Sequence, residues 1–317
     1  MNMMNNDKTP MTEQDTSLAG GGLKEHDSYY LLNPLKKGQR TYRAVSRATN
    51  IECLVKLYTP GSWQGFSDAS MRNCFLREKT IQDILVGAEH HPNILYATEI
   101  QNQGKYCFVV FPYIHGGDLW AASGFLGPLE PRQSAQVVAG ICDGLDHLHC
   151  LGVVHRDMKL DNVLLHISDP ATDSVREALK SGTLVPIISD FEFALHERTR
   201  TYDPEDHCIL GTEQYIAPEM WKGLAVDCRS DIYGAGIMLF EILTGNYPFV
   251  RSGRDSNFRR LHLKASMRDP RRFNRKITPG ICAVLEKAIA KDPDRRYQTV
   301  RQLKDDYLNA VEMRTSS

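Results

Sequence analysis

The strongest constraint in this 317-residue chain is the run HRDMKLDN, at residues 155–162, followed later in the chain by SDFEFA. Asn162 and Asp190 offer hard oxygen ligands, which Mg²⁺ prefers alongside water and phosphate oxygens. Asp157 would take up a proton from a hydroxyl group, and Lys159 would place a cation beside a transferring group. Eight ordered letters with matching neighbours argue against chance, so we expect the fold to bring these four side chains together.

Composition agrees with a large folded unit but does not select a function. The chain is 42% hydrophobic and 24% charged, enough to bury a large core as one bilobal unit or two small domains. A net charge of −1 gives no reason to expect nucleic acid as a partner, and no apolar run is long enough to predict a membrane segment. The eight cysteines include no CxxC pair, which predicts reduced core thiols in a cytoplasmic or nuclear protein.

Periodicity divides the chain into segments. Residues 1–26 are polar and are expected to form a flexible leader. Residues 27–111 alternate β-branched and aromatic runs around one helical segment, which predicts a small sheet-rich lobe. Helical spacing then dominates, so we predict a larger helical lobe over 118–310 and a short tail at 311–317. Inside it, the polar tract 168–183 contains an amphipathic piece at 173–180 and is expected to be an inserted surface loop.

The two opening runs resemble the catalytic core of protein kinases, and further motifs in the same order extend the resemblance over residues 29–307. The resemblance implies an α+β, bilobal kinase fold that uses ATP and Mg²⁺. Lys159 resembles the Ser/Thr class, which implies phosphate transfer to serine or threonine of protein substrates. Asp157 would act as the base, with Asn162 and Asp190 as the metal ligands.

Other positions match the ATP-binding elements of the family. Lys56 in CLVKLY resembles the strand lysine that holds the α- and β-phosphates, and Glu78 resembles the helix residue that supplies its counter-charge. The run FPYIHGGDL resembles the hinge, which we place at 112–117. This implies that Phe111 flanks the adenine pocket and that Tyr113 belongs to the ATP site.

Substrate-binding positions follow from the same resemblance. GTEQYIAPE resembles the end of the activation segment and a platform for protein substrates, which disfavours a small-molecule kinase. Thr212 would contact Asp157. Asp118, Asp161 and Glu241 match positions at which kinases that prefer basic substrates carry acids that read Arg or Lys. Ordinary solvated carboxylates are an equally weighted alternative.

Three matched residues would support the fold more than the chemistry. Glu219 would pair with Arg296, and Asp231 would brace the catalytic loop from a buried helix.

Gln82 falls one helical turn after Glu78, where active kinases pack an apolar residue. Cys208 stands at the usual activation-loop phosphosite, so regulation by phosphate there is not expected.

The sequence departs from the family in the loop that covers the phosphates. Its three glycine positions hold Pro34, Lys36 and Gln39, and only Gly38 lies nearby, out of register. The backbone would therefore approach the phosphates less closely. Lys36 and Gly38 remain the candidate phosphate contacts. The alternative for Lys36 is an ordinary solvated lysine on a turn. Glu192 stands where the family triplet has glycine, and would add negative charge beside the metal site.

These departures, with the run YYLLNPLKKGQRTYRAV, give a narrower resemblance to the Tribbles group, whose first loop is glycine-poor and whose triplet ends in Glu. That resemblance implies a pseudokinase adaptor that binds signalling kinases of MAPK cascades or ubiquitin-ligase machinery. Asp190 and Asn162, which typical Tribbles members lose, favour an enzyme. The first hypothesis is therefore a Ser/Thr kinase of low activity, and the second is the adaptor.

Overall fold

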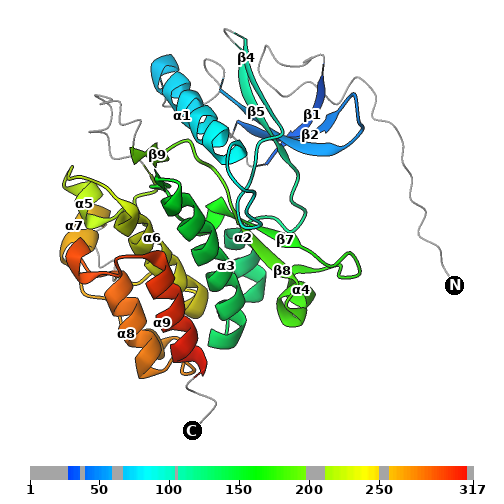
Figure 1. The fold of residues 1–317 in the computed structure, drawn as a ribbon. Helices are drawn as coiled ribbons and strands as arrows, with labels where there is room; N and C mark the ends of the chain where they lie inside the picture. The colour runs from blue at the N-terminus through cyan, green and yellow to red at the C-terminus, as the bar shows by residue number, and fades with distance from the viewer. Residues whose placement is uncertain are drawn as a thin grey trace, which may run out of the picture.

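The computed structural model describes residues 28–35, 40–58, 67–103, 106–197, 211–249 and 257–312. The described chain has a small lobe built on a sheet and a larger lobe built from helices (Figure 1). The predicted α+β class is confirmed, because the longer strands come first in the chain and most helices follow.

Five antiparallel strands form the sheet of the small lobe, in the order β1-β2-β3-β5-β4. Along β3, Val55 and Leu57 join one apolar cluster, whereas Leu54 joins a second cluster on the side of α1, as does Tyr58 just after the strand. Lys56 falls between Leu54 and Tyr58 in this alternation, so its side chain points toward α1. The strands are β1 (Tyr29–Pro34), β2 (Thr41–Ser46), β3 (Glu52–Leu57), β4 (Glu99–Gln103) and β5 (Tyr106–Pro112).

Helix α1 (Asp68–Val86) packs against both lobes. Ser67 caps its start by accepting a hydrogen bond from the backbone N–H three residues on. In its first half Phe75 packs under the sheet, and in its second half Ile81 enters the core of the helical lobe. Glu78 lies between these two contacts, so packing on either side fixes its position at the junction of the lobes.

Helix α6 (Cys228–Thr244) is the centre of the large lobe, and almost all of its residues are buried. A Cβ at Gly236 would lie 2.7 Å from Cγ2 of Ile289, so glycine permits the close approach of the segment that ends α8. The other helices of this lobe are α2 (Leu119–Leu126), α3 (Pro131–Cys150), α5 (Pro218–Trp221), α7 (Phe258–Lys264), α8 (Pro279–Ala288) and α9 (Val300–Glu312).

Two short antiparallel strand pairs lie beside these helices and carry the motif-bearing loops. β6 (Val153–Val154) pairs with β9 (Leu195–His196), and β7 (Val163–Ile167) pairs with β8 (Leu184–Ile188). HRDMKLDN connects β6 to β7, and SDFEFA connects β8 to β9. Because both loops join the same paired strands, the fold brings two runs that are distant in sequence to one place.

The tract 168–183, expected as an inserted surface loop, carries a helix over its amphipathic piece. It joins β7 to β8 and contains helix α4 (Val175–Ser181), which Ser174 caps. Ala178 is fully buried, and Leu179 also belongs to the core of the large lobe. Packing removes the apolar face of this amphipathic piece from water, which accounts for its burial.

Seven of the eight cysteines lie within the described residues, and those seven are free thiols; Cys208 lies outside. Among the helices of the described ranges, none is both long enough and apolar enough to cross a membrane.

Candidate active site

Lys56 on β3 is buried and contacts carboxylates from both lobes. Its Nζ lies 2.6 Å from Oε2 of Glu78 on α1 and 2.5 Å from Oδ1 of Asp190 on the β8–β9 connection. Glu78 is fully buried, so its carboxylate requires a counter-charge, which Lys56 supplies. The predicted pairing of Lys56 with Glu78 is therefore present, and it joins the two lobes through Asp190.

Two further donors hold the Glu78 carboxylate. The hydroxyl of Tyr58 donates to Oε2 at 2.5 Å, and the backbone N–H of Phe191 donates to Oε1 at 3.3 Å. Burial, and then Glu78, raise the pKa of Tyr58 well above its ordinary value, so its hydroxyl keeps its proton and donates. Glu78 thereby fixes the position of α1 relative to both Lys56 and the SDFEFA run.

The Asp157 carboxylate is buried and held by three residues. Lys159 Nζ donates to Oδ2 at 2.6 Å, Asn162 Nδ2 donates to the same atom at 3.0 Å, and the backbone N–H of Thr212 donates to Oδ1 at 2.8 Å. Lys159 also donates to Oγ1 of Thr212 at 2.8 Å. The structure thus assembles the predicted contact between Thr212 and Asp157, and places Lys159 against both.

Buried Asp231 of α6 braces the loop that carries these residues. Its two carboxylate oxygens accept hydrogen bonds from the backbone N–H groups of His155 and Arg156, both at 2.8 Å. Arg156 has a positive φ of 66°, and Asp190 has one of 69°. Side chains other than glycine adopt this region rarely, and surrounding contacts must maintain it. The residue expected to brace the loop is thus found in contact with it.

Charge at the site keeps Asp190 ionised. Burial alone would raise its pKa, but Lys56 and then Lys159 outweigh burial and lower the pKa to about 2. Burial would likewise lower the pKa of Lys159, yet Asp157 and Asp190 outweigh it and raise that pKa. Neither group changes charge near neutral pH, so the site presents a fixed pattern of ammonium and carboxylate groups.

The chemistry of the donor set fits a Mg²⁺ ion with nucleotide phosphates. Asp190 is ionised and its side chain is 30% exposed, so one of its oxygens is accessible to a ligand from solvent. The Asn162 amide nitrogen donates to the backbone oxygen and to Oδ2 of Asp157, which turns its carbonyl oxygen the other way. One carboxylate and one amide oxygen, with water and phosphate, are what Mg²⁺ accepts.

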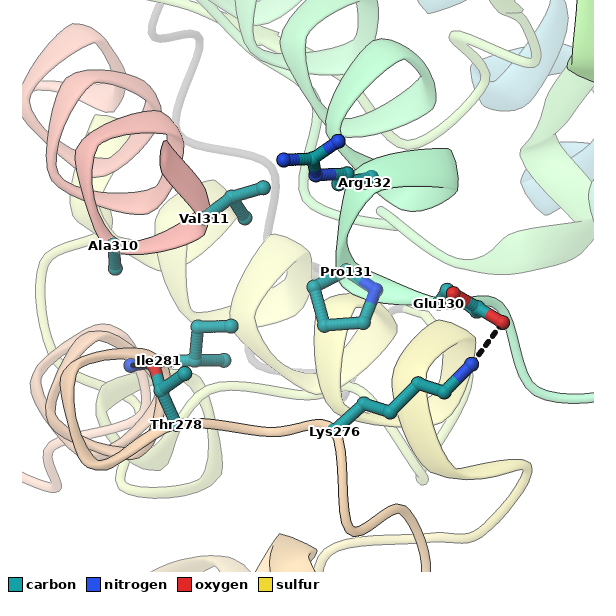
Figure 2. Close-up of a pocket in the computed structure, with 8 residues that line it drawn as sticks. All are labelled: Glu130, Pro131, Arg132, Lys276, Thr278, Ile281, Ala310 and Val311. Atoms are coloured by element: carbon teal, nitrogen blue, oxygen red, sulfur yellow. Dashed lines mark hydrogen bonds and ion pairs between the residues drawn. The ribbon is translucent and has the colours of Figure 1, made fainter. Parts of the chain in front are cut away.

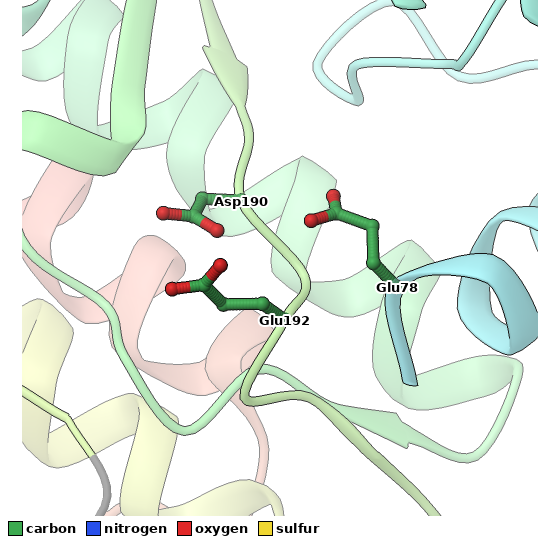
Figure 3. Close-up of side chains that lie close together, drawn as sticks. All are labelled: Glu78, Asp190 and Glu192. Carbon is green, nitrogen blue, oxygen red and sulfur yellow. The ribbon is translucent and has the colours of Figure 1, made fainter. Parts of the chain in front are cut away.

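Glu192 does not lie as an uncompensated charge beside this donor set. Its side chain is 3% exposed and forms an ion pair with the guanidinium of Arg40, itself 5% exposed. Its Oε2 also lies 3.0 Å from Lys56 Nζ. In Figure 3 the carboxylates of Glu78, Asp190 and Glu192 converge on one point. Two cations already occupy this group, so we assign no metal to it.

Gln82 is accommodated without an unsatisfied polar group. It is fully buried, its Nε2 donates to Leu95 O at 3.2 Å, and its Oε1 accepts from Ala97 N at 2.9 Å. His155 and Phe191 pack against each other with ring centroids 5.4 Å apart. A polar residue at 82 therefore ties α1 to the segment before β4, where the family would pack an apolar side chain.

Phe111 and Tyr113, the two residues matched to the hinge, lie near the end of β5 and just after it. Phe111 is buried in the cluster formed by the sheet and α1, and Tyr113 packs its ring beneath the guanidinium of Arg43, 4.9 Å away. Lys36 and Gly38, the candidate phosphate contacts, lie outside the described residues, as does Gln39.

The three acids matched to substrate recognition have different surroundings. Asp118 caps α2, since its Oδ1 accepts from Ala121 N at 2.7 Å. Glu241 on α6 accepts a hydrogen bond from the Tyr215 hydroxyl at 2.6 Å. Burial raises the pKa of Glu241 to about 7; Tyr215 opposes this shift, and nearby Asp161 adds to it. Glu241 and Asp161 therefore form an acidic pair under the activation segment, whereas Asp118 has a structural role as a cap.

A separate cavity of about 290 Å³ lies in the large lobe, between the starts of α3 and α8 and the end of α9 (Figure 2). Ile281, Ala310 and Val311 contribute apolar walls, and an ion pair between Lys276 and Glu130 lies at one side. None of the predicted site residues lines it, so this cavity is separate from the site around Lys56, Asp157 and Asp190.

Sequence reasoning missed two residues of the site, Arg40 and Tyr58. Tyr58 donates to Glu78, and its ring lies 4.2 Å from the Arg40 guanidinium. The presence of Glu192 in a glycine position is a signal that some cation must compensate it. The chain has 38 lysines and arginines, however, and sequence alone does not indicate which one.

Comparison with known proteins agrees with this geometry. Residues 40–308 match the family described as protein kinase domain. The chain is 31% identical to serine/threonine-protein kinase PknB of Mycobacterium leprae over 225 residues, which cover 70% of this chain and 34% of that protein. It is 35% identical to PkaA of Streptomyces coelicolor over 234 residues, covering 73% of this chain and 38% of that protein.

Serine/threonine-protein kinase PrkC of Bacillus subtilis is 29% identical over 77% of this chain and 35% of its own length. The chain therefore spans about a third of the length of these relatives. The matched region contains both lobes, the Lys56–Glu78 pair and the Asp157 loop. On these grounds the chain belongs to the protein kinase family.

Proposed function

We propose that this chain is a serine/threonine protein kinase, which transfers the terminal phosphate of ATP to a hydroxyl of a protein substrate. The observation that carries the proposal is the surroundings of Asp157. Lys159, Asn162 and the Thr212 backbone hold its carboxylate in one orientation, while Asp190 stays ionised nearby. Relatives named as serine/threonine-protein kinases support the same reaction class.

In this proposal each residue has a defined task. Asp157 accepts the proton of the attacking hydroxyl, and Lys159 provides positive charge beside the transferring group. Asn162 and Asp190 would hold Mg²⁺, which neutralises charge on the phosphates when it is bound. Lys56 supplies charge to the phosphates from the sheet, and buried Glu78 positions it.

Preference for basic residues near the target hydroxyl is part of this proposal. Asp161, and Glu241 once pH exceeds its pKa of about 7, would give the region beneath the activation segment negative charge, which would attract Arg or Lys of a substrate. Asp118 contributes less, because its carboxylate already caps α2.

The test uses three peptides that differ only in the acceptor, Ser, Thr or Tyr, each with Arg residues before it. With Mg²⁺ and labelled ATP, we expect phosphate on the Ser and Thr peptides, and loss of incorporation in Lys56→Met. Mass spectrometry identifies the modified residue. Label on the Tyr peptide alone, or equal incorporation in Lys56→Met, would contradict the proposal.

A second function has one specific observation in its favour. Three carboxylates surround the Lys56 ammonium, which leaves little capacity for nucleotide phosphate and suits a Tribbles-like adaptor that scaffolds MAPK-cascade or ubiquitin-ligase partners. The named relatives give no specific support for it. Weak or absent nucleotide binding, together with no phosphate transfer in the peptide assay, would favour this alternative.

A further inference from the structure

Arg40 and Glu192 form a buried ion pair that joins the sheet to the SDFEFA run. Arg40 lies just before β2, and its backbone oxygen accepts from Leu57 N at 2.9 Å, which holds it beside the end of β3. Its guanidinium stacks on the Tyr58 ring at 4.2 Å and lies 3.9 Å from the sulfur of Met71 on α1. Its position is thus set by the small lobe.

The Lys56 ammonium donates hydrogen bonds to Glu78 and Asp190 and forms an ion pair with Glu192. It has three N–H donors, and three acids surround it: Glu78 at 2.6 Å, Asp190 at 2.5 Å and Glu192 at 3.0 Å. A nucleotide phosphate that is to contact Lys56 must therefore compete with these carboxylates for the ammonium. Glu192 makes the longest of the three contacts, so it is the weakest competitor.

The three carboxylates differ in what they would lose by leaving Lys56. Glu78 is held in place by Tyr58 and the Phe191 backbone, and Asp190 is the candidate metal ligand. Glu192 alone among the three has an ion pair with Arg40. A buried carboxylate without a counter-charge costs several kcal/mol, so only Arg40 allows Glu192 to be released from Lys56 without becoming unpaired.

We propose that Arg40 is a positioning residue for nucleotide binding, which retains the Glu192 carboxylate while Lys56 exchanges it for a nucleotide phosphate. The inference rests on the proposed kinase function. Glu192 acts as an internal competitor of the phosphate on Lys56, and Arg40 limits that competition. Glu192 in the glycine position and Arg40 before β2 therefore work as one unit.

The test is a double-mutant cycle on the affinity for Mg²⁺ and a non-hydrolysable ATP analogue, measured by calorimetry. The four proteins are wild type, Arg40→Met, Glu192→Gln and the double variant. We expect Arg40→Met to weaken binding by about tenfold or more, because Lys56 becomes the sole counter-charge of Glu192. In the Glu192→Gln background the same change is expected to alter affinity by less than about twofold. Glu192→Gln alone is expected to bind more tightly than wild type.

Arg40→Lys is the conservative control and keeps the charge with one donor group, so it is expected to retain most of the affinity. Should Arg40→Met fail to fold by circular dichroism, Arg40→Gln, which removes the charge but keeps a polar side chain, takes its place in the cycle with the same expected coupling. An equal loss on changing Arg40 in both backgrounds would overturn the inference, because it would mean that Arg40 acts without Glu192.

Binding and catalysis separate the two proposals. Additive effects in proteins that bind nucleotide overturn the role of Arg40 and leave the kinase proposal standing. A coupled cycle without phosphate transfer supports Arg40 and counts against catalysis. Absence of nucleotide binding in all four proteins would contradict both.

Discussion

Lys159 and Thr212 are joined by a hydrogen bond of 2.8 Å from Nζ to Oγ1, although they lie 53 residues apart in the chain. The same ammonium donates to Asp157, and the Thr212 backbone donates to the other oxygen of that carboxylate. The end of the activation segment thereby completes the surroundings of the proposed base, so the placement of residue 212 decides whether the base is correctly oriented.

Replacing Thr212 tests this relationship. Thr212→Val removes the hydroxyl but keeps the backbone N–H, so Asp157 keeps all three of its donors while Lys159 loses a partner that helps to position it. A hydrogen bond to a charged group contributes about 1.5–3 kcal/mol, which predicts a fall in kcat of about tenfold or more. Initial rates at saturating ATP measure this. Thr212→Ser is expected to keep the rate, and an unchanged rate in Thr212→Val would show that the hydroxyl is dispensable.

Removing Asp190 tests the metal site. Asp190→Ala deletes the only ionised carboxylate assigned to Mg²⁺, so the dependence of nucleotide affinity on Mg²⁺ is expected to disappear. Calorimetry with and without EDTA measures that dependence. Asp173→Ala, which removes an exposed carboxylate before α4, serves as the control and is expected to behave as wild type. If Mg²⁺ still raised the affinity of Asp190→Ala, the assignment would be wrong.

The buried pair of Glu219 and Arg296 is expected to support the fold without taking part in the chemistry. Both nitrogens of the guanidinium fork lie 2.7 Å from the carboxylate oxygens, and both side chains are buried. Breaking such a pair costs about 3–5 kcal/mol. Arg296→Met should lower the free energy of unfolding by that amount in urea titration, whereas Arg295→Met, at an exposed neighbour, should change it little. Equal effects would contradict the assignment.

Stability is expected to depend on pH through Glu241. Its pKa in the folded state, about 7, exceeds the ordinary value of 4.5, so between these two values the folded state binds more protons than the unfolded state. Stability therefore falls as pH rises through this window. Glu241→Gln should match wild type near pH 4.5 and exceed it above pH 7, by up to about 3 kcal/mol at about 1.4 kcal/mol per pH unit. Thermal unfolding across pH 4.5–8 measures the difference, and parallel curves for the two proteins would rule out the shift.

The sequence predicts much of the site because its contacts join motif residues with ordered spacing. Lys56 with Glu78, Thr212 with Asp157 and Glu219 with Arg296 were each expected as pairs, and the structure brings each pair into contact. Such pairs can be predicted because the motifs that carry them occur in a recognisable order along the sequence.

The remaining features depend on distances that one sequence does not specify. The partner of Glu192 is 152 residues away, and only the packing of the sheet against the SDFEFA run selects Arg40 over other cations. Gln82 is satisfied by backbone groups of the segment before β4, which no side-chain pattern reveals. The burial of α4 was not predicted, because the amphipathic pattern at 173–180 does not show which surface its apolar face packs against.

The most direct test of the account is phosphate transfer by wild type and Asp157→Asn on the same basic serine peptide with Mg²⁺ and labelled ATP. Asparagine keeps the size of the side chain but cannot accept the hydroxyl proton, so the rate is expected to fall by about 10²–10⁴ while the fold and nucleotide affinity persist. Transfer at equal rates by the two proteins, or by neither, would contradict the assignment of the site around Asp157 as a kinase active site.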